Sequence, residues 1–312
     1  MRKWDGRLLG AFLVALAAII WGTLGLVAKF LYAEGVAFEA VVATRALGAF
    51  LVIFSVLAVR RRLGTLRVGA RDLASLVPLG IVSIGCFYLL YFYTVQETEV
   101  GTAAVLLYSS PAFVVVLARV FLKEALSVVR LAALTMTAVG ILLVVGVTSP
   151  SELSVSPFVV LTGLGAGLSY GLYSVVGKPL TARLPSSTIT CYILGVGAAV
   201  LVVFALPKLG TLAGLTGWVY LLLAASAVVH TALTYALYTA GLKLLEAGQA
   251  AIIAMVEPVV AGAVGVFFLS EELTVTKVAG AVLVVGGAAV AQIRLSKPRR
   301  SRLSSDEGAS LR

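Results

Sequence analysis

The hydrophobic residues of this chain are grouped in long runs, and short polar segments separate one run from the next. A run of about 20 apolar residues, wound as an α-helix, crosses the roughly 30 Å hydrocarbon core of a lipid bilayer. Because a helix satisfies its own backbone hydrogen bonds, such runs are expected to be helical in lipid. The pattern therefore predicts ten membrane-spanning helices, over residues 8–31, 37–59, 73–95, 100–122, 126–147, 156–178, 187–207, 217–242, 248–269 and 274–294.

The pattern occurs twice along the chain. WGTLGLVAKFL at 21–31 returns as YGLYSVVGKPL at 170–180, and the segment at 100–128 returns at 247–275, an offset of 147 residues. Such self-similarity in an apolar chain is typical of membrane transporters built from two structural repeats. Each half holds five spans, an odd number, so two halves that fold alike must lie upside down relative to one another. We expect an all-α polytopic membrane protein, built as an inverted repeat of five plus five transmembrane helices. The first repeat covers 1–147, a connection 148–155, the second repeat 156–294, and a basic, disordered cytoplasmic tail 295–312.

The composition excludes a soluble domain. Hydrophobic residues make up 61% of the chain and charged residues 12%, whereas globular proteins carry roughly 25% charged residues. The start of the chain resembles a secretory signal peptide, but its apolar run continues to Leu31, past the usual length of about 7–15 residues, so a retained first span is expected. Cys86 and Cys191 lie inside apolar runs, which favours two buried thiols over a disulfide framework or a metal site.

The net charge of +10 is carried mainly by residues near the span ends, which points to the membrane surface and not to nucleic acid. Lys and Arg concentrate on the cytoplasmic side of multi-pass membrane proteins. Here they concentrate at the chain ends and in the even-numbered connections, which predicts cytoplasmic N- and C-termini in a cell (inner or plasma) membrane. These groups are expected to set the topology and to contact anionic lipid headgroups. They include Arg2, Lys3, Arg7, Arg60, Arg61, Arg62, Arg67, Arg71, Arg119, Lys123, Arg130, Lys178, Arg183 and Lys243.

Glu257 is the main candidate for a functional charge within a span. A charged group at mid-span costs roughly 2.5–3.5 kcal/mol on insertion scales, so it needs a reason. Pro258 beside it removes a backbone hydrogen bond and kinks the helix, and Pro111, next to Ser110, does the same in the first repeat. Two symmetry-related kinked helices with polar groups at the break are expected around a central substrate site. The alternative is that a protonated Glu257 caps a freed carbonyl or ties two helices together.

His230 and Arg45 are the other ionisable candidates. His230, the only histidine, lies mid-span and is matched in the first repeat by Ser83; it lines the cavity or makes an interhelical hydrogen bond. Arg45 lies too deep in its span for easy snorkelling, and its repeat partner is the apolar Leu194. It is expected to pair with Glu257 or a carbonyl, or to meet an anionic group of the substrate.

Aromatic residues that recur in both halves complete the candidate site. Tyr88 returns as Tyr235, and Trp21 is matched by Tyr170. A hydroxyl or indole N–H deep in a span needs a polar partner, so these residues are expected to line a cavity. The expected substrate-binding set is Trp21, Tyr88, Ser110, Tyr170, His230, Tyr235 and Glu257, with Pro111 and Pro258 as helix kinks and Arg45 as an intramembrane charge.

Residue sets typical of catalysis are missing from the predicted spans, which hold neither paired acids nor a His/Cys cluster nor a Ser–His spacing suited to a dyad. One histidine and two distant cysteines do not make a metal site. We therefore expect no catalytic residues, no metal and no other cofactor, and an intramembrane enzyme is the least favoured function.

Several short motifs add to this picture, and one of them occurs in both halves. Trp21–Gly22 in the first span is followed by Lys29, Arg45 lies in the second span, and Glu257–Pro258 lies in the second repeat. The motif F-L-x-E-x-L occurs at 121–126 and again at 268–273, with Glu124 and Glu271 as its acids. In these features the chain resembles the EamA family of the drug/metabolite transporter superfamily, over residues 8–294. The resemblance implies ten helices in inverted repeat, cytoplasmic termini and transport of small metabolites, usually efflux, through a central cavity.

We therefore expect a secondary transporter, and by resemblance an exporter of small organic metabolites, with amino acids as the leading substrate class. Its mechanism would be alternating access around a midplane cavity, and its partners a small-molecule substrate and membrane lipid. A nucleotide-sugar or phosphorylated-metabolite carrier of the same superfamily is the first alternative, but it requires cationic groups in the cavity, where Arg45 is the candidate. A passive uniporter is the second alternative, and proton coupling stays open because no second buried acid accompanies Glu257. The Glu124 and Glu271 side chains are expected to have structural roles at helix ends.

Overall fold

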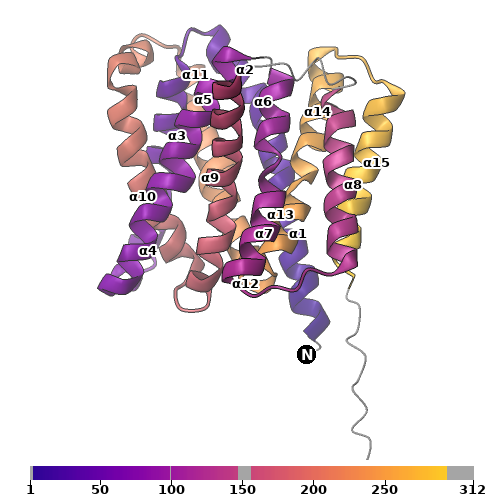
Figure 1. Ribbon diagram of the computed structural model, residues 1–312. Helices are drawn as coiled ribbons and strands as arrows, with labels where there is room; N and C mark the ends of the chain where they lie inside the picture. Colours follow the sequence, from indigo (N-terminus) through magenta and orange to yellow (C-terminus); the bar gives the residue numbers. More distant parts are fainter. Residues whose placement is uncertain (1–2, 99, 147–155, 294–312) are drawn as a thin grey trace, which may run out of the picture.

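The computed structural model describes residues 3–98, 100–146 and 156–293, and within them every regular element is a helix and there are no strands (Figure 1). The predicted connection 148–155 and tail 295–312 lie outside the described residues. The first five spans are α1 (Lys3–Gly22) with α2 (Leu24–Ala33), α3 (Phe38–Val59), α4 (Ala70–Gly80) with α5 (Phe87–Glu97), α6 (Val100–Leu107) with α7 (Ser110–Phe121), and α8 (Val128–Val145). The second five are α9 (Pro157–Thr181), α10 (Ser186–Ala205), α11 (Gly217–Ala227) with α12 (Thr234–Leu244), α13 (Ala247–Ala254) with α14 (Val256–Leu269), and α15 (Val275–Val290).

The prediction of an all-α polytopic chain is confirmed. Nine of the spans in the described residues are long and apolar enough to cross a membrane, and α15 is a shorter apolar helix at the tenth predicted position. Large apolar side chains such as Phe12, Leu161 and Phe267 are exposed on the outside of the bundle. In a chain of this hydrophobicity such a surface is the one that faces lipid.

Helix interruptions lie at matching places in the two halves. A π-helical segment at Ile81–Cys86 joins α4 to α5, and another at Val228–Leu233, 147 positions later, joins α11 to α12. The breaks between α6 and α7 and between α13 and α14 also correspond, since α6 ends at Leu107 and α13 at Ala254. Pro111 and Pro258 have no N–H to donate to the carbonyl oxygens of Leu107 and Ala254, so each span breaks where the sequence predicts a kink. The break at Thr23, between α1 and α2, has no counterpart in the continuous α9.

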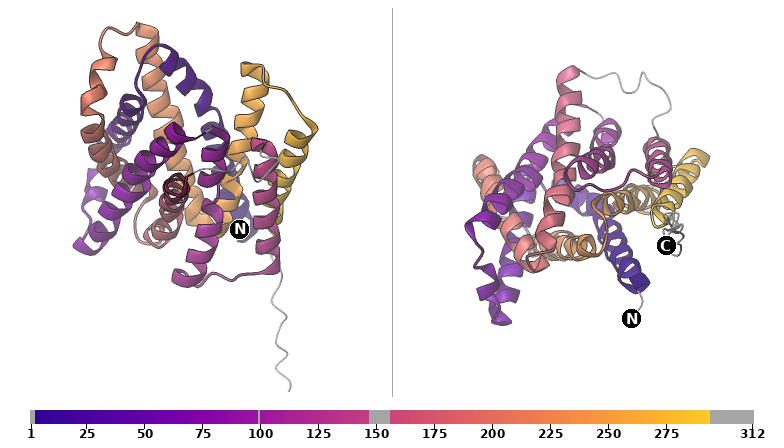
Figure 2. Two further views of the ribbon diagram at one scale, coloured as in Figure 1. Left: turned by 45° about the horizontal axis from the view of Figure 1, so that its top comes forward. Right: turned by 60° about the horizontal axis from the view of Figure 1, so that its bottom comes forward.

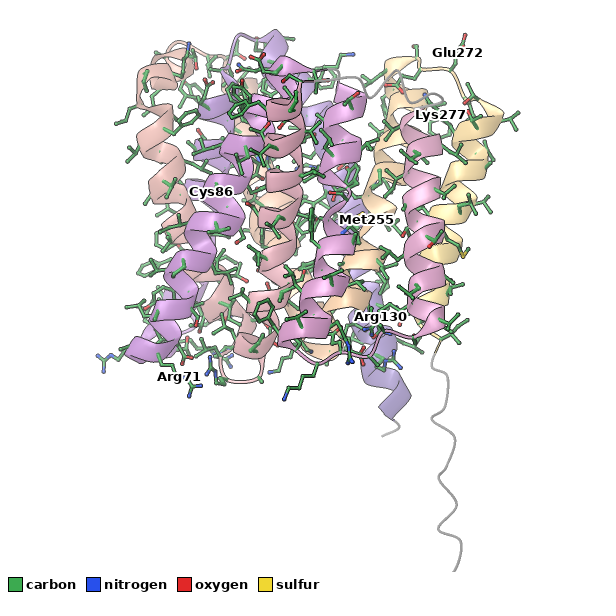
Figure 3. All side chains as sticks on the ribbon, in the orientation of Figure 1. Arg71, Cys86, Arg130, Met255, Glu272 and Lys277 are labelled. Atoms are coloured by element: carbon green, nitrogen blue, oxygen red, sulfur yellow. The ribbon has the colours of Figure 1, made fainter. Side chains whose placement is uncertain are left out.

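The labelled residues of Figure 3 define the two ends of the bundle. Arg71 and Arg130 lie at the end where α1 begins, called here the Arg130 end, and Glu272 and Lys277 lie at the other, called the Lys277 end. Because Arg130 belongs to the first turn of α8, this helix runs towards the Lys277 end. The next span, α9, then runs back, opposite in direction to α1, which makes the second repeat inverted.

Helices from the two repeats pack against one another. Within the described chain α1 packs on α12 and α14, α9 packs on α5 and α7, and α3 packs on α10. At one edge of the bundle α8 and α15 pair face to face (Figures 1 and 2). This pair depends on glycine, because a Cβ at Gly280 would lie 2.6 Å from the carbonyl oxygen of Gly140. The interlocked arrangement leaves α1, α9 and α12 at the centre, and their side chains form the candidate site.

Candidate functional site

Five aromatic residues from three helices meet at the centre of the bundle. Trp21, at the end of α1, lies edge-on to Tyr170 of α9 and Tyr235 of α12, with ring centroids 6.4 and 5.5 Å apart. Tyr238 of α12 and Tyr173 of α9 close the group, 5.8 Å apart. With Ser83 and Ser174 they line a cavity of about 10 Å³, which holds about one water molecule. The centre of the bundle is therefore closed to any larger molecule in this conformation.

The π-helical segment Val228–Leu233 supplies an anchor for Trp21. The indole Nε1 donates to the carbonyl oxygen of His230 at 3.1 Å, and the Thr234 hydroxyl donates to the same oxygen at 2.8 Å. The His230 ring lies with its Nε2 3.0 Å from the hydroxyl of Thr23, at the break between α1 and α2. Its Nδ1 is buried and has no hydrogen-bond partner among the described residues. The structure thus places the ring at an interhelical contact outside the residues that line the small cavity.

Arg45 is buried in α3 and its guanidinium is held by neutral groups. Its Nε donates to the Thr231 hydroxyl at 3.3 Å, and its Nη2 lies 3.5 Å from the Tyr88 hydroxyl, with the guanidinium carbon 6.0 Å from the Tyr88 ring centroid. Among the described residues no ion pair joins Arg45 to Glu257, the partner that the sequence suggested. A buried guanidinium without a counterion is able to accept an anionic ligand group.

Glu257 lies in the first turn of α14, directly after the break at Met255, and is half-buried. Its Oε1 accepts a hydrogen bond from the Tyr108 hydroxyl at 3.3 Å. The Tyr170 hydroxyl interacts with the same carboxyl group but makes no hydrogen bond of standard geometry to it. Trp21 of the aromatic cluster lies close to both charges: its indole bonds the carbonyl oxygen of His230, next to the Thr231 that binds Arg45, and the adjacent Gly22 packs on the backbone of Glu257.

Gly22 brings α1 against the backbone of α14 at this point. A Cβ at Gly22 would lie 2.7 Å from the carbonyl oxygen of Glu257 and 2.6 Å from the Cβ of Val260. Only glycine allows this approach, and it keeps Trp21 and Glu257, which belong to different repeats, at one site.

Three further expected site residues have packing positions. Ser110 is buried against Gly171 of α9 and is not among the residues lining the central cavity. Pro111 lies in the first turn of α7, and Pro258 in the first turn of α14. Each proline begins the second half of a broken span. Tyr108 lies at the break before α7, and Glu257 lies directly after the break before α14.

A second, larger cavity opens at the Lys277 end. It measures about 340 Å³ and is lined by residues of α2, α3, α5 and the connection after α10, among them Tyr32, Glu39, Phe92 and Lys208. Phe38 and Glu39 of its lining belong to α3, the helix that also carries Arg45. The bundle is therefore more open at the Lys277 end than at its centre.

Sequence reasoning missed several residues that the fold brings to the site. Tyr108 corresponds to Met255 in the second repeat, so the comparison of repeats gave no signal for it. Tyr173 lies three residues after Tyr170, on the same face of α9, and that spacing was an available signal. Thr231, which accepts a hydrogen bond from Arg45, lies in a π-helical segment that sequence reasoning did not predict. In the described part of the chain no group of three or more His, Cys, Asp or Glu side chains is arranged to hold a metal ion.

Two inverted repeats of five helices, interrupted at matching places around a central polar and aromatic site, define a multi-pass membrane protein with the architecture of a secondary transporter. The model of the EamA-like transporter family matches residues 8–146 and 157–292, and the chain belongs to this family. It is a transporter of the EamA, drug/metabolite type, and the predicted family is confirmed.

Relatives with the same organisation occur in archaea and bacteria. An uncharacterized transporter of Archaeoglobus fulgidus is 33% identical over 201 residues, 64% of this chain and 70% of its own. The uncharacterized inner membrane transporter YicL of Salmonella typhimurium is 24% identical over 94% of this chain and 97% of its own. A probable terminal-alkyne amino-acid exporter of Streptantibioticus cattleyicolor is 30% identical over 47% of each chain. A crystal structure that covers 92% of this chain and 97% of its own, at 19% identity, has a TM-score of 0.76 and therefore the same fold.

Proposed function

We propose that the protein exports small zwitterionic metabolites, with α-amino acids as the leading class, across the cell membrane by alternating access. The observation that carries the proposal is the placement of two unlike charges next to the aromatic cluster. Trp21 bonds the backbone of His230, beside the Thr231 that holds Arg45, and Gly22 packs on the backbone of Glu257. Neither charge has an ion-pair partner in the described chain. An α-amino acid presents an ammonium and a carboxylate, which are the complementary groups.

Each charge has a defined role in this proposal. The Glu257 carboxylate, oriented by Tyr108, accepts hydrogen bonds from the ammonium group, and the Arg45 guanidinium binds the carboxylate through two parallel donors. Trp21 and the tyrosines between them contact the side chain of the substrate. An apolar or aromatic side chain suits such rings, and the ammonium group gains a further attraction from their faces.

The central cavity and the cavity at the Lys277 end support alternating access. A further cavity of about 310 Å³ between α3 and α10, beside Leu66, is lined by none of the aromatic residues of the site. A central cavity of about 10 Å³ is too small for an amino acid, whereas the cavity at the Lys277 end, about 340 Å³, is large enough. Transport then requires the helices around Trp21 to separate and admit the substrate between Arg45 and Glu257. The clustering of Arg and Lys residues near the Arg130 end favours a cytoplasmic location for that end and for both termini. The amino-acid exporter of Streptantibioticus cattleyicolor supports this substrate class and outward direction.

Counterflow in proteoliposomes tests the proposal. Purified protein is assayed with labelled amino acids, nucleotide sugars and cationic drugs, and exchange of amino acids is expected. Glu257→Gln removes the charge at the ammonium site. A hydrogen bond to a charged group is worth roughly 1.5–3 kcal/mol, so KM should rise by about 10- to 100-fold. The matched control, Glu272→Gln, changes an exposed acid outside the site and should leave KM unchanged.

Two outcomes separate the alternatives. Exchange of phosphorylated compounds alone would overturn the amino-acid proposal and assign Arg45 to phosphate binding. Dissipation of a substrate gradient without proton movement would identify a passive uniporter, whereas proton movement that Glu257→Gln abolishes would show coupling through this carboxyl group.

A further inference from the structure

The two repeats end their fourth spans with the same backbone structure. Lys123, after α7, and Ser270, after α14, both adopt the left-handed conformation, with φ of 56° and 58°. The following glutamate then donates its N–H back to the helix, Glu124 to Ala118 and Glu271 to Gly265, each at 3.1 Å. Local structure therefore places Glu124 and Glu271 in equivalent positions. The contacts of the two carboxylates therefore differ only because the neighbouring helices are placed differently around them.

At the Arg130 end, Glu124 ties α7 to the start of α13. Its carboxylate accepts hydrogen bonds from the backbone N–H groups of Ala247 at 2.7 Å and Gly248 at 3.2 Å. Arg130 of α8 donates to the same carboxylate at 3.3 Å and also bonds Glu246, the residue before α13. The Glu124 side chain is 8% exposed. Three helices from both repeats, α7, α8 and α13, are thus joined at one buried carboxylate, which complements the positive end of the α13 dipole.

At the Lys277 end, no equivalent contact joins Glu271 to α6 among the residues that the structure describes. The Glu271 side chain is 49% exposed and pairs with Lys277, the counterpart of Arg130, at 3.1 Å. The helix that corresponds to α13 is α6, whose first turn contains Gly101. In the described residues α13 packs against α7 and α8, but α6 is not among the helices that pack against α14 or α15. The Lys277 end therefore has the equivalent glutamate, paired with a lysine where the Arg130 end has an arginine, and its helices are apart.

We propose that Glu124 and Glu271 are alternating clamps of the transport cycle. In the conformation seen here Glu124 holds the start of α13 and closes the Arg130 end. In the opposite conformation Glu124 releases α13, and Glu271 accepts hydrogen bonds from the first N–H groups of α6 and closes the Lys277 end. The duplicated F-L-x-E-x-L motif then serves gating, beyond the helix-end role expected from sequence. This inference rests on the proposed alternating access, but it requires no particular substrate.

Cysteine accessibility in the absence of substrate tests the clamps. Cys86 and Cys191 are replaced by alanine, and Gly248→Cys or Gly101→Cys is introduced as a reporter at the start of α13 or α6. An added Cβ makes ordinary contacts at Gly248, where the nearest atoms lie at 3.4 Å, whereas at Gly101 it lies 3.1 Å from the Val145 side chain, which has to shift by a few tenths of an ångström. Labelling rates with a polar maleimide are measured on detergent-solubilised protein, where both ends are accessible.

The proposal predicts reciprocal changes at the two reporters. Glu124→Gln should speed labelling of Gly248→Cys about tenfold, which corresponds to about 1.4 kcal/mol, and should slow labelling of Gly101→Cys. Glu271→Gln should slow labelling of Gly248→Cys, and the double variant should return towards the parent protein. Glu272→Gln, next to Glu271 and exposed, is the control and should change neither rate.

A static role for Glu124 gives a different result. Faster labelling of Gly248→Cys with no change at Gly101→Cys, together with no effect of Glu271→Gln, would overturn the proposal. If Glu124→Gln does not fold, Glu271→Gln still decides, because the Glu271 side chain is about half exposed and its replacement should not prevent folding. Unaltered labelling at both reporters then contradicts alternation. Since no substrate enters the assay, a failed amino-acid exchange leaves this test intact, and a failed labelling test leaves the substrate proposal intact.

Discussion

Replacement of Gly22 by alanine tests the contact between α1 and α14 that forms the site. The added Cβ would lie 2.6 Å from the Cβ of Val260 and 2.7 Å from the carbonyl oxygen of Glu257. Carbon atoms pack favourably at about 3.5–4.0 Å, so the two helices would have to separate by about 1 Å. Overpacking of this kind costs about 1–3 kcal/mol. The gain from replacing a helical glycine by alanine, up to about 1 kcal/mol, offsets only part of this cost.

The assay compares Gly22→Ala with Gly25→Ala. Gly25 lies on the adjoining helix α2 and has no atom within 4 Å of an added Cβ, so it reports the effect of helix propensity alone. Thermal unfolding in detergent should show a Tm several degrees lower for Gly22→Ala, whereas Gly25→Ala should match or exceed the parent Tm. Counterflow by Gly22→Ala should be slower because Trp21 and Glu257 move apart. Equal stability and transport of the two variants would refute the reasoning.

Two other changes give direct checks on packing and on the site. Gly280→Ala should lower Tm in the same unfolding assay, since its Cβ would lie 2.6 Å from a backbone oxygen of α8. The control on the same helix, Gly286→Ala, meets only the flexible end of Met136 at 3.1 Å and should leave Tm nearly unchanged. Tyr108→Phe removes a neutral donor to Glu257, worth about 0.5–1.5 kcal/mol, and should raise KM for exchange by about two- to tenfold; an unchanged KM would mean that Tyr108 does not orient the carboxylate.

The apolar runs were sufficient to predict the spans because in lipid a helix is the only local structure that such a run can adopt. The predicted edges, 37–59 and 217–242 for example, lie close to the observed Phe38–Val59 and Gly217–Leu244. The breaks near Pro111 and Pro258 followed from the missing N–H of proline, which is a local property of the sequence. These features needed no knowledge of how the helices pack.

The orientation of side chains about each helix was not predictable in the same way. Nearly every face of these helices is apolar, so hydrophobic periodicity does not say which face turns inward. Ser110 was assigned to the cavity through its symmetry with Glu257, but it packs on Gly171. The π-helical segments and the break at Thr23 depend on tertiary contacts, such as the bond from Trp21 to the backbone of His230. The roles of Arg130 and Glu246 became visible only when α7, α8 and α13 were seen to meet.

The matched π-helical segments also bear on how the two halves of the chain are related. A π-helical turn holds more residues than an α-helical turn, so Ile81–Cys86 and Val228–Leu233 each contain an irregularity that a regular helix lacks. Both occur at the same position of the repeat, and their side chains now differ, with Ser83 in one copy and His230 in the other. This match is expected if each half is a copy of one five-helix unit that already contained the irregularity. The two halves differ in the side chains at this position and share the backbone that shapes the centre of the bundle.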